Sequence, residues 1–325
     1  MIVKFFGKTY PITIVVLVII ALATQLPCVI FPGKFFVTDH YSPIINLIRY
    51  LYKISPFLSS SVLLVCFFAC LFTIDKINTN NLLISKTSLL PPIVFALLFQ
   101  FQLYNPALIA NMLVLISINR LLNINSQEEN AYNEVDFFAA GFMVGIATLT
   151  DLPAVLFLLF IIIAVFVIGA AYKFRDILII ITGFTLPLII WLFIEFVSGD
   201  INSTAGFFNP LKVNFEIFRN IFSITDYIFI GYIVLLIIIS IIFVYSKLYK
   251  MNIALRNKYL FFIIIMVISL ILVVIFNYPI TYLLMSLPIL SILLSYLMIN
   301  IKSFWADILF CLLAIIPAIY TFINA

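Results

Sequence analysis

Two acidic side chains stand where a carboxylate could act on a substrate at a membrane surface. Asp39 lies in the loop just after the first hydrophobic segment and precedes His40, the only histidine of the chain. A carboxylate in this place could take a proton from a substrate hydroxyl. The alternative is a solvated loop acid near the N-cap of the helix that follows.

Asp151 lies in a turn between two hydrophobic stretches and is the second candidate. The stretch before it, Phe137 to Leu149, has 13 residues, or about 20 Å of helix. A bilayer core is about 30 Å thick, so either the bilayer thins there or Asp151 lies in a cavity below the outer surface. A turn residue beside Pro153 is the alternative. Glu195 is interpreted as a surface acid at a helix end.

The composition places these acids in a membrane protein. Of 325 residues, 66% are hydrophobic and 9% are charged, and the mean hydropathy is +1.30. Soluble domains are about half apolar and a quarter charged. A water-soluble enzyme is therefore excluded, and the predicted fold is an all-α transmembrane bundle forming a single domain over residues 1–325.

Eight stretches are long enough to span a bilayer. They run from Tyr10 to Ile30, Pro56 to Ile74, Ala154 to Tyr172, Ile177 to Val197, Ile224 to Tyr245, Tyr259 to Phe276, Tyr278 to Ile299 and Phe304 to Ile323. Two short hairpins between the second and third stretches add three more segments. The prediction is about 11 helices.

Lysines and arginines are distributed unevenly over the loops. With the N-terminus inside, 12 lie on the inner side and five on the outer side. Because cytoplasmic loops carry the excess of such residues, we expect the N-terminus inside and the C-terminus outside. The five outer residues are Lys34, Arg49, Lys53, Lys212 and Arg219.

Each of the two long outer loops, residues 31–55 and 198–223, contains an amphipathic stretch. After Pro43, one helical face carries Ile44, Ile45, Leu47, Ile48 and Leu51, and the other carries Asn46, Arg49, Tyr50 and Lys53. In the second loop, one helical face carries Phe215, Phe218, Ile221 and Phe222, and the opposite face carries Glu216, Arg219 and Asn220. Such helices lie in the membrane interface, as simple anchors or as the roof of an outer cavity.

Several other polar or small residues are assigned to packing. Gly141 and Gly145 have the spacing that lets two helices approach closely. Hydrogen bonds between helices are expected from Gln100, Gln102, Asn105 and Asn111. The four cysteines are interpreted as buried thiols, and no zinc site is expected.

Part of the chain resembles an uncharacterised family of bacterial multi-pass membrane proteins, a domain of unknown function. The resemblance covers about Leu89 to Trp191 and is carried by Asn105 to Asn111, by Phe137 to Leu149 and by Arg175 to Pro187. It implies a multi-pass protein of the bacterial inner membrane and names no activity.

The order of segments also resembles the GT-C glycosyltransferases, which use lipid-phosphate sugars. Members have a first helix, an outer loop with an essential acid and interfacial helices, then short paired helices and a glycine-rich segment similar to Gly141–Leu149. Asp39 matches the loop acid. Many members have a second acid where this chain has His40, and a basic residue where it has Asp151.

The GT-C resemblance implies that Asp39 deprotonates the acceptor hydroxyl while a sugar is transferred with inversion. The substrate-binding candidates are then His40 and the cations Lys34, Arg49, Lys53, Lys212 and Arg219, which would stabilise the leaving phosphate. The implied partners are membrane lipid and a polyprenyl-phosphate sugar. No cofactor is expected, although a divalent cation fits such chemistry, and no nucleic acid partner is expected.

Two other function classes remain open. The chain could be a non-catalytic membrane subunit of an envelope export, motility or assembly complex, with a membrane protein partner. It could also be a transporter, for which inverted repeats and broken helices are typical; no repeat is visible in the two halves.

Overall fold

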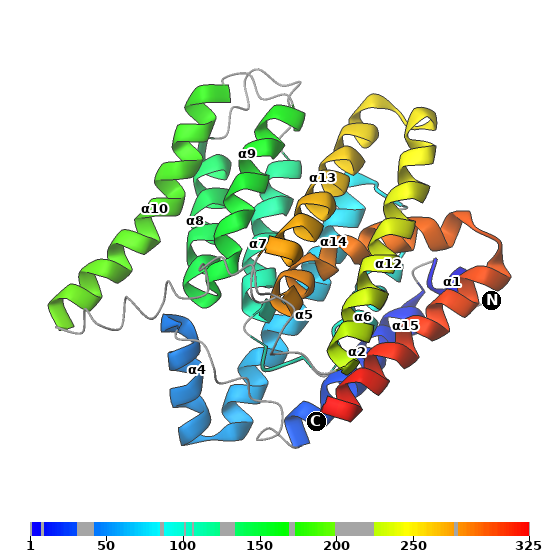
Figure 1. Ribbon diagram of the computed structural model, residues 1–325, viewed down its shortest axis with the longest axis horizontal. Coiled ribbons are helices and arrows are strands. Elements are labelled where there is room, and N and C mark those ends of the chain that lie inside the picture. Colours follow the sequence, from blue (N-terminus) through cyan, green and yellow to red (C-terminus); the bar gives the residue numbers. More distant parts are fainter. Residues whose placement is uncertain are drawn as a thin grey trace.

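The computed structural model describes residues 2–7, 10–30, 42–84, 88–100, 102–105, 107–123, 134–168, 173–198, 224–275 and 279–324, and in these ranges its regular elements are all helices, without a strand (Figure 1). The elements are α1 (Ile2–Phe6), α2 (Pro11–Ile30), α4 (Pro43–Ile54), α5 (Pro56–Asn81), α6 (Leu90–Leu98), α7 (Ala107–Leu122), α8 (Glu134–Thr150), η1 (Leu152–Val155), α9 (Leu156–Ile168), α10 (Lys173–Ser198), α12 (Ile224–Lys247), η3 (Leu248–Lys250), α13 (Ile253–Ile275), α14 (Pro279–Asn300) and α15 (Ser303–Asn324).

Seven of the described helices are long and apolar enough to cross a membrane: α2, α5, α10, α12, α13, α14 and α15. The chain is therefore a multi-pass membrane protein with a helical bundle, as its composition predicts. The total of about 11 spans and the orientation stay predictions, because they depend on helices shorter than a bilayer core.

The short helices occupy the middle of the sequence. α6 has 9 residues, α7 has 16, α8 has 17 and α9 has 13. At about 1.5 Å per residue, they measure about 14 to 26 Å. The span expected to begin at Ala154 begins as α9 at Leu156, because the turn at Asp151 continues into η1 before α9 begins.

α8 is longer than the stretch from Phe137 to Leu149 suggested. It begins at Glu134, where acidic residues in the first turn are favourable beside the positive end of the helix dipole. Asp136 also pairs with Arg120 at 2.9 Å, and Glu134 pairs with Arg175 at 3.3 Å. The expected mismatch with the bilayer is correspondingly smaller, since 17 residues make about 26 Å of helix.

The α6–α7 hairpin lies at the centre of the bundle. Every residue of α6 is buried, and amide side chains connect the hairpin to its neighbours. Gln25 Nε2 donates to the carbonyl of Phe99 at 2.7 Å, and Gln100 Nε2 donates to that of Ala314 at 3.1 Å. Gln100 thus forms a hydrogen bond to another helix, as expected. The expectation was wrong for Gln102 and Asn105, which bond to each other at 3.3 Å within the turn.

Asn111 compensates for a proline in α14. Pro288 has no N–H, so the carbonyl of Leu284, four residues earlier, loses its helical donor. Asn111 Nδ2 donates to this carbonyl oxygen at 3.0 Å from α7. The pairing explains how a proline is accommodated in α14, whose central residues are almost all buried.

We expect Asn111→Leu to lower the free energy of unfolding by about 1 kcal/mol, since the carbonyl of Leu284 then has no donor. Pro288→Ala supplies a backbone N–H to that carbonyl, so Asn111→Leu should cost little in the Pro288→Ala background. Unfolding of the four proteins in a detergent titration measures this coupling. If the two substitutions changed the free energy of unfolding additively, the idea that Asn111 compensates for Pro288 would be contradicted.

Candidate functional site

Asp151 occupies a tight turn between α8 and η1. Its backbone N–H donates to the carbonyl of Ala147, and its own carbonyl accepts from Ala154 N, both at 2.9 Å. The side chain is only 7% exposed, and Oδ2 is buried without a hydrogen-bond partner among the described residues. The carboxyl is thus buried inside the described part of the structure, and the expectation that it faces an outer cavity stays a prediction.

Burial has a direct consequence for the acidity of this group. Loss of hydration disfavours the charged form and raises the pKa of the Asp151 carboxyl to about 7. A carboxyl with such a pKa exists in both forms near neutral pH and can accept or return a proton. Perturbed acids of this kind are enriched in functional sites.

α4 is held against the end of α8 beside this turn. Ser42, the N-cap of α4, places its hydroxyl 2.6 Å from the carbonyl oxygen of Leu149 and 2.7 Å from that of Thr150, and donates its proton to them. These are carbonyls of the last turn of α8, which lack helical donors. The amphipathic helix predicted after Pro43 is confirmed, and it is anchored beside Asp151.

Only part of the predicted apolar face of α4 packs against the bundle. Ile45 and Ile48 are buried, whereas Leu47 is 60% exposed. Arg49 is half-buried, with Nη1 3.5 Å from Asn46 Oδ1, and Lys53 is exposed in the last turn. Leu47 belongs to the apolar face predicted for an interfacial helix, and an exposed leucine there is compatible with contact to lipid.

Glu195 belongs to the same end of the bundle. Its Oε1 accepts a hydrogen bond from Trp191 Nε1 at 3.1 Å, and Trp191 packs with Leu149 and Leu152 on either side of the Asp151 turn. The interpretation of Glu195 as a plain surface acid was therefore incomplete, since the side chain is half-buried and orients a core tryptophan.

The other predicted site residues lie outside the described residues. They are Lys34, Asp39 and His40 in the first outer loop, and Lys212 and Arg219 in the second, together with the second amphipathic stretch. Of the predicted site, the structure places Asp151, Arg49 and Lys53. Asp151 and the start of α4 lie together, as the bonds of Ser42 show.

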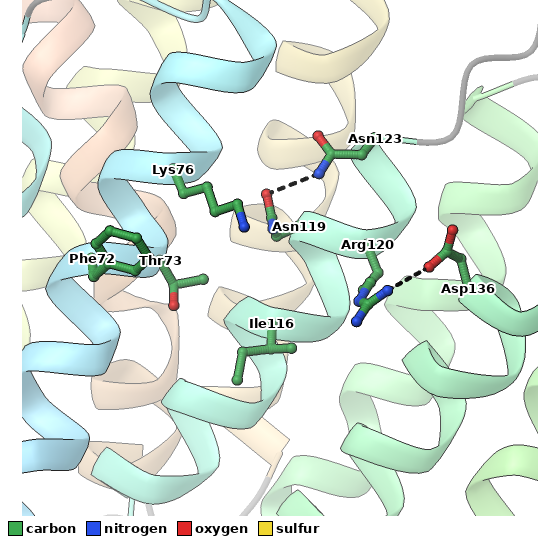
Figure 2. Close-up of a pocket in the computed structure, with 8 residues that line it drawn as sticks. All are labelled: Phe72, Thr73, Lys76, Ile116, Asn119, Arg120, Asn123 and Asp136. Atoms are coloured by element: carbon green, nitrogen blue, oxygen red, sulfur yellow. Dashed lines mark hydrogen bonds and ion pairs between the residues drawn. The ribbon is translucent and has the colours of Figure 1, made fainter.

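A pocket of about 400 Å³ opens at the opposite end of α8 (Figure 2). Helices α5, α7 and α8 line it, together with Asn123, which directly follows α7. The lining residues are Phe72, Thr73, Lys76, Ile116, Asn119, Arg120, Asn123 and Asp136. Fifteen residues of helix separate Asp136 from Asp151, a distance of about 22 Å. This pocket is thus separate from the Asp151 turn.

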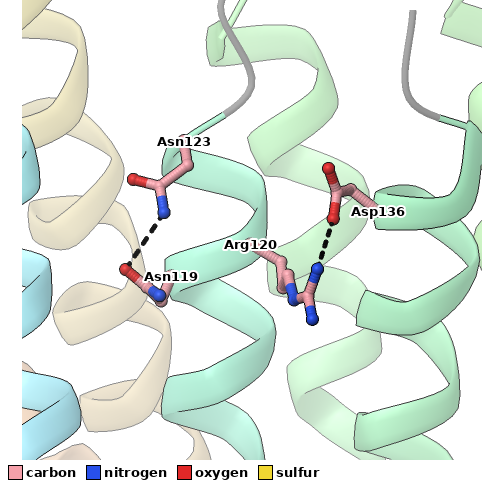
Figure 3. A network of polar contacts seen from close by, with 4 residues as sticks. All are labelled: Asn119, Arg120, Asn123 and Asp136. Carbon is pink, nitrogen blue, oxygen red and sulfur yellow. Dashed lines mark hydrogen bonds and ion pairs between the residues drawn. The ribbon is translucent and has the colours of Figure 1, made fainter.

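Polar contacts organise the rim of the pocket (Figure 3). Arg120 Nη1 and Asp136 Oδ1 are 2.9 Å apart, and Asn123 Nδ2 donates to Asn119 Oδ1 at 3.4 Å. The Arg120 side chain is 54% exposed, and ion pairs this exposed add little to stability. Lys76 and Arg120 belong to the 12 lysines and arginines that the charge bias places on the inner side, and nothing in their spacing along the chain predicts the pocket.

A buried acid in α10 was also missed. Asp176 is fully buried, and neither carboxylate oxygen has a hydrogen-bond partner among the described residues. The available signal was its place at the start of a hydrophobic stretch, where an acid is costly.

The described residues show no group of three or more histidine, cysteine or acidic side chains that could hold a metal ion. Of the cysteines, Cys28 and Cys70 are buried and Cys66 is half-buried. Cys311 is exposed on α15, so its assignment to a buried position was wrong.

Comparison with known proteins assigns no family to the chain. No family model matches it, and neither a curated protein nor a solved structure does. The resemblances of the sequence therefore stay predictions, and the function has to be argued from the site.

Proposed function

We propose that this membrane protein is a GT-C-like glycosyltransferase, which transfers a sugar from a polyprenyl-phosphate donor at the periplasmic face of a bacterial inner membrane. The observation that carries the proposal is the buried Asp151 carboxyl, which has an oxygen without a partner among the described residues. Buried acids in membrane proteins are costly and usually functional.

The position of α4 supports a site assembled from two segments. Ser42 is bonded to the end of α8 beside Asp151, and Asp39 stands three residues before Ser42 in the sequence. In the proposed reaction, the Asp39 carboxylate takes the proton of the acceptor hydroxyl. The acceptor oxygen bonds to the anomeric carbon while the bond from that carbon to the phosphate oxygen breaks, and polyprenyl phosphate leaves.

The roles of the remaining groups follow from charge. Arg49 and Lys53 on α4, with Lys34, Lys212 and Arg219, would stabilise the leaving phosphate, as cations do for developing negative charge. Asp151 would hold the acceptor by a hydrogen bond from or to its carboxyl, since burial leaves this group able to exist in either form near pH 7.

Neither alternative is favoured by a specific observation. The small-residue face of α8, which could bind a partner subunit, is already covered by α10. The proline break in α14, which could mark a transporter, is compensated by Asn111.

We expect the purified protein in lipid nanodiscs to transfer sugar from at least one member of a panel of labelled polyprenyl-phosphate sugars. Asp39→Asn and Asp151→Asn should both reduce transfer to background, because each removes an ionisable carboxyl at the proposed site. Glu134→Gln is the matched control, since it makes the same acid-to-amide change at the exposed far end of α8.

Two outcomes would overturn the proposal. The first is normal transfer by a folded Asp151→Asn protein. The second is no transfer by the wild-type protein from any donor together with stable co-purification of a membrane protein partner, which would favour the subunit function.

A further inference from the structure

α5 and α7 present the same two-residue pattern to the pocket. Lys76 follows Phe72 by four residues on α5, and Arg120 follows Ile116 by four residues on α7. Residues four apart lie on one helical face, so each helix presents a cation with an apolar side chain one turn deeper. Figure 2 shows Ile116 below the polar side chains and Phe72 beside Thr73 on α5.

The rim offers hydrogen-bond donors to an anion. Lys76 Nζ has no hydrogen-bond or ion-pair partner among the described residues. Arg120 directs one nitrogen to Asp136, and its guanidinium has five N–H groups. Two cations face one carboxylate, which leaves the pocket with one net positive charge. A phosphate group, with several acceptor oxygens, matches this set of donors.

The lower wall points to a lipid rather than to a free ion. Phe72 is 67% exposed on a helix long enough to span the membrane, and Ile116 is half-exposed. A free phosphate gains nothing from such a wall, whereas acyl chains do. The volume of about 400 Å³ falls within the usual range for small-molecule pockets.

We propose that this pocket binds an anionic phospholipid, with Lys76 and Arg120 on the phosphate oxygens and the acyl chains along Phe72 and Ile116. The charge bias of the sequence predicts that this end of the bundle faces the cytoplasm, where basic pockets between spanning helices bind phosphate headgroups. The site is separate from the proposed sugar-transfer site and does not depend on it.

Native mass spectrometry of the detergent-purified protein tests this, with phosphatidylglycerol and phosphatidylcholine of identical acyl chains. We expect tighter binding of phosphatidylglycerol. Lys76→Gln should weaken it about fivefold and Lys76→Gln with Arg120→Gln about 25-fold, since each cation near an anionic surface contributes about a factor of five. Lys76→Arg should retain the affinity.

The control removes two charges elsewhere. Lys250→Gln with Arg256→Gln removes one charge from η3 and one from the first turn of α13, outside the pocket, and should leave the affinity unchanged. An equal loss in both double variants would overturn the pocket as the binding site. Displacement of phosphatidylglycerol by millimolar inorganic phosphate alone would overturn the lipid assignment, whereas resistance to phosphate supports it.

Discussion

Replacing Gly141 with alanine is expected to lower the free energy of unfolding by about 3 kcal/mol, the upper end for overpacking a well-packed core. A Cβ at this position would collide with the backbone carbonyl of Ile180 in α10. A backbone group cannot rotate away as a side-chain tip can, so α8 and α10 would have to separate along their contact.

Both helices contribute glycines to this contact, so the methyl group of an alanine on either helix would meet the backbone of the other. Gly145 lies against the carbonyl oxygen of Phe184 and the ring of Pro187, both 2.5 Å from an added Cβ, and Gly183 of α10 lies against the carbonyl of Phe138. Because residue numbers rise together along the contact, the two helices run parallel, with α9 returning the chain between them. Small residues allow such close packing between spanning helices.

Gly231→Ala provides a matched control. Gly231 lies within α12, and an added Cβ there has no atom within 4 Å. Alanine at that position should be neutral or slightly stabilising, because it favours helix more than glycine does. Unfolding in a detergent titration compares the two variants, and equal midpoints would show that α8 and α10 do not approach this closely.

The sequence predicted features that depend on spacing. The glycine pair predicted a close contact between two helices, and the helical spacing of apolar and polar residues after Pro43 predicted α4. Burial was much harder to predict, because lipid tails are as apolar as a protein core. α6 is buried along its whole length, whereas Phe193, Phe196 and Val197 of α10 are exposed, and all belong to equally hydrophobic stretches.

The candidate site was only partly predictable for a related reason. The shortness of one hairpin drew attention to Asp151, and the structure shows that its side chain is buried. The pocket combines Lys76, Arg120 and Asp136, which come from three helices. Nothing in the spacing along the chain shows that these helices meet, so the pocket could be found only from tertiary packing.

The stability of the protein should depend on pH through Asp151. The pKa of its carboxyl is raised by burial from an ordinary value of 3.8 to about 7. Below about pH 4 the carboxyl is protonated in both the folded and the unfolded chain. Between about pH 4 and pH 7 the unfolded chain releases the proton while the folded protein retains it, so stability falls as pH rises.

The difference between these two pKa values corresponds to about 4 kcal/mol, lost in full above about pH 7. Asp151→Asn has no proton to release and should remove this part of the pH dependence, so that its melting temperature exceeds that of the wild type increasingly as pH rises through this window. Thr150→Val alters the neighbouring buried residue without removing an ionisable group and should retain the wild-type slope.

Melting curves measured at intervals of pH in one detergent distinguish burial of Asp151 from its role in transfer. If Asp151→Asn is more stable at high pH and also inactive, the chain retains a carboxyl that costs stability, as expected of a functional group. If the wild type and Asp151→Asn show the same pH dependence, the carboxyl reaches water or a cation, and the environment that supports its proposed role is absent.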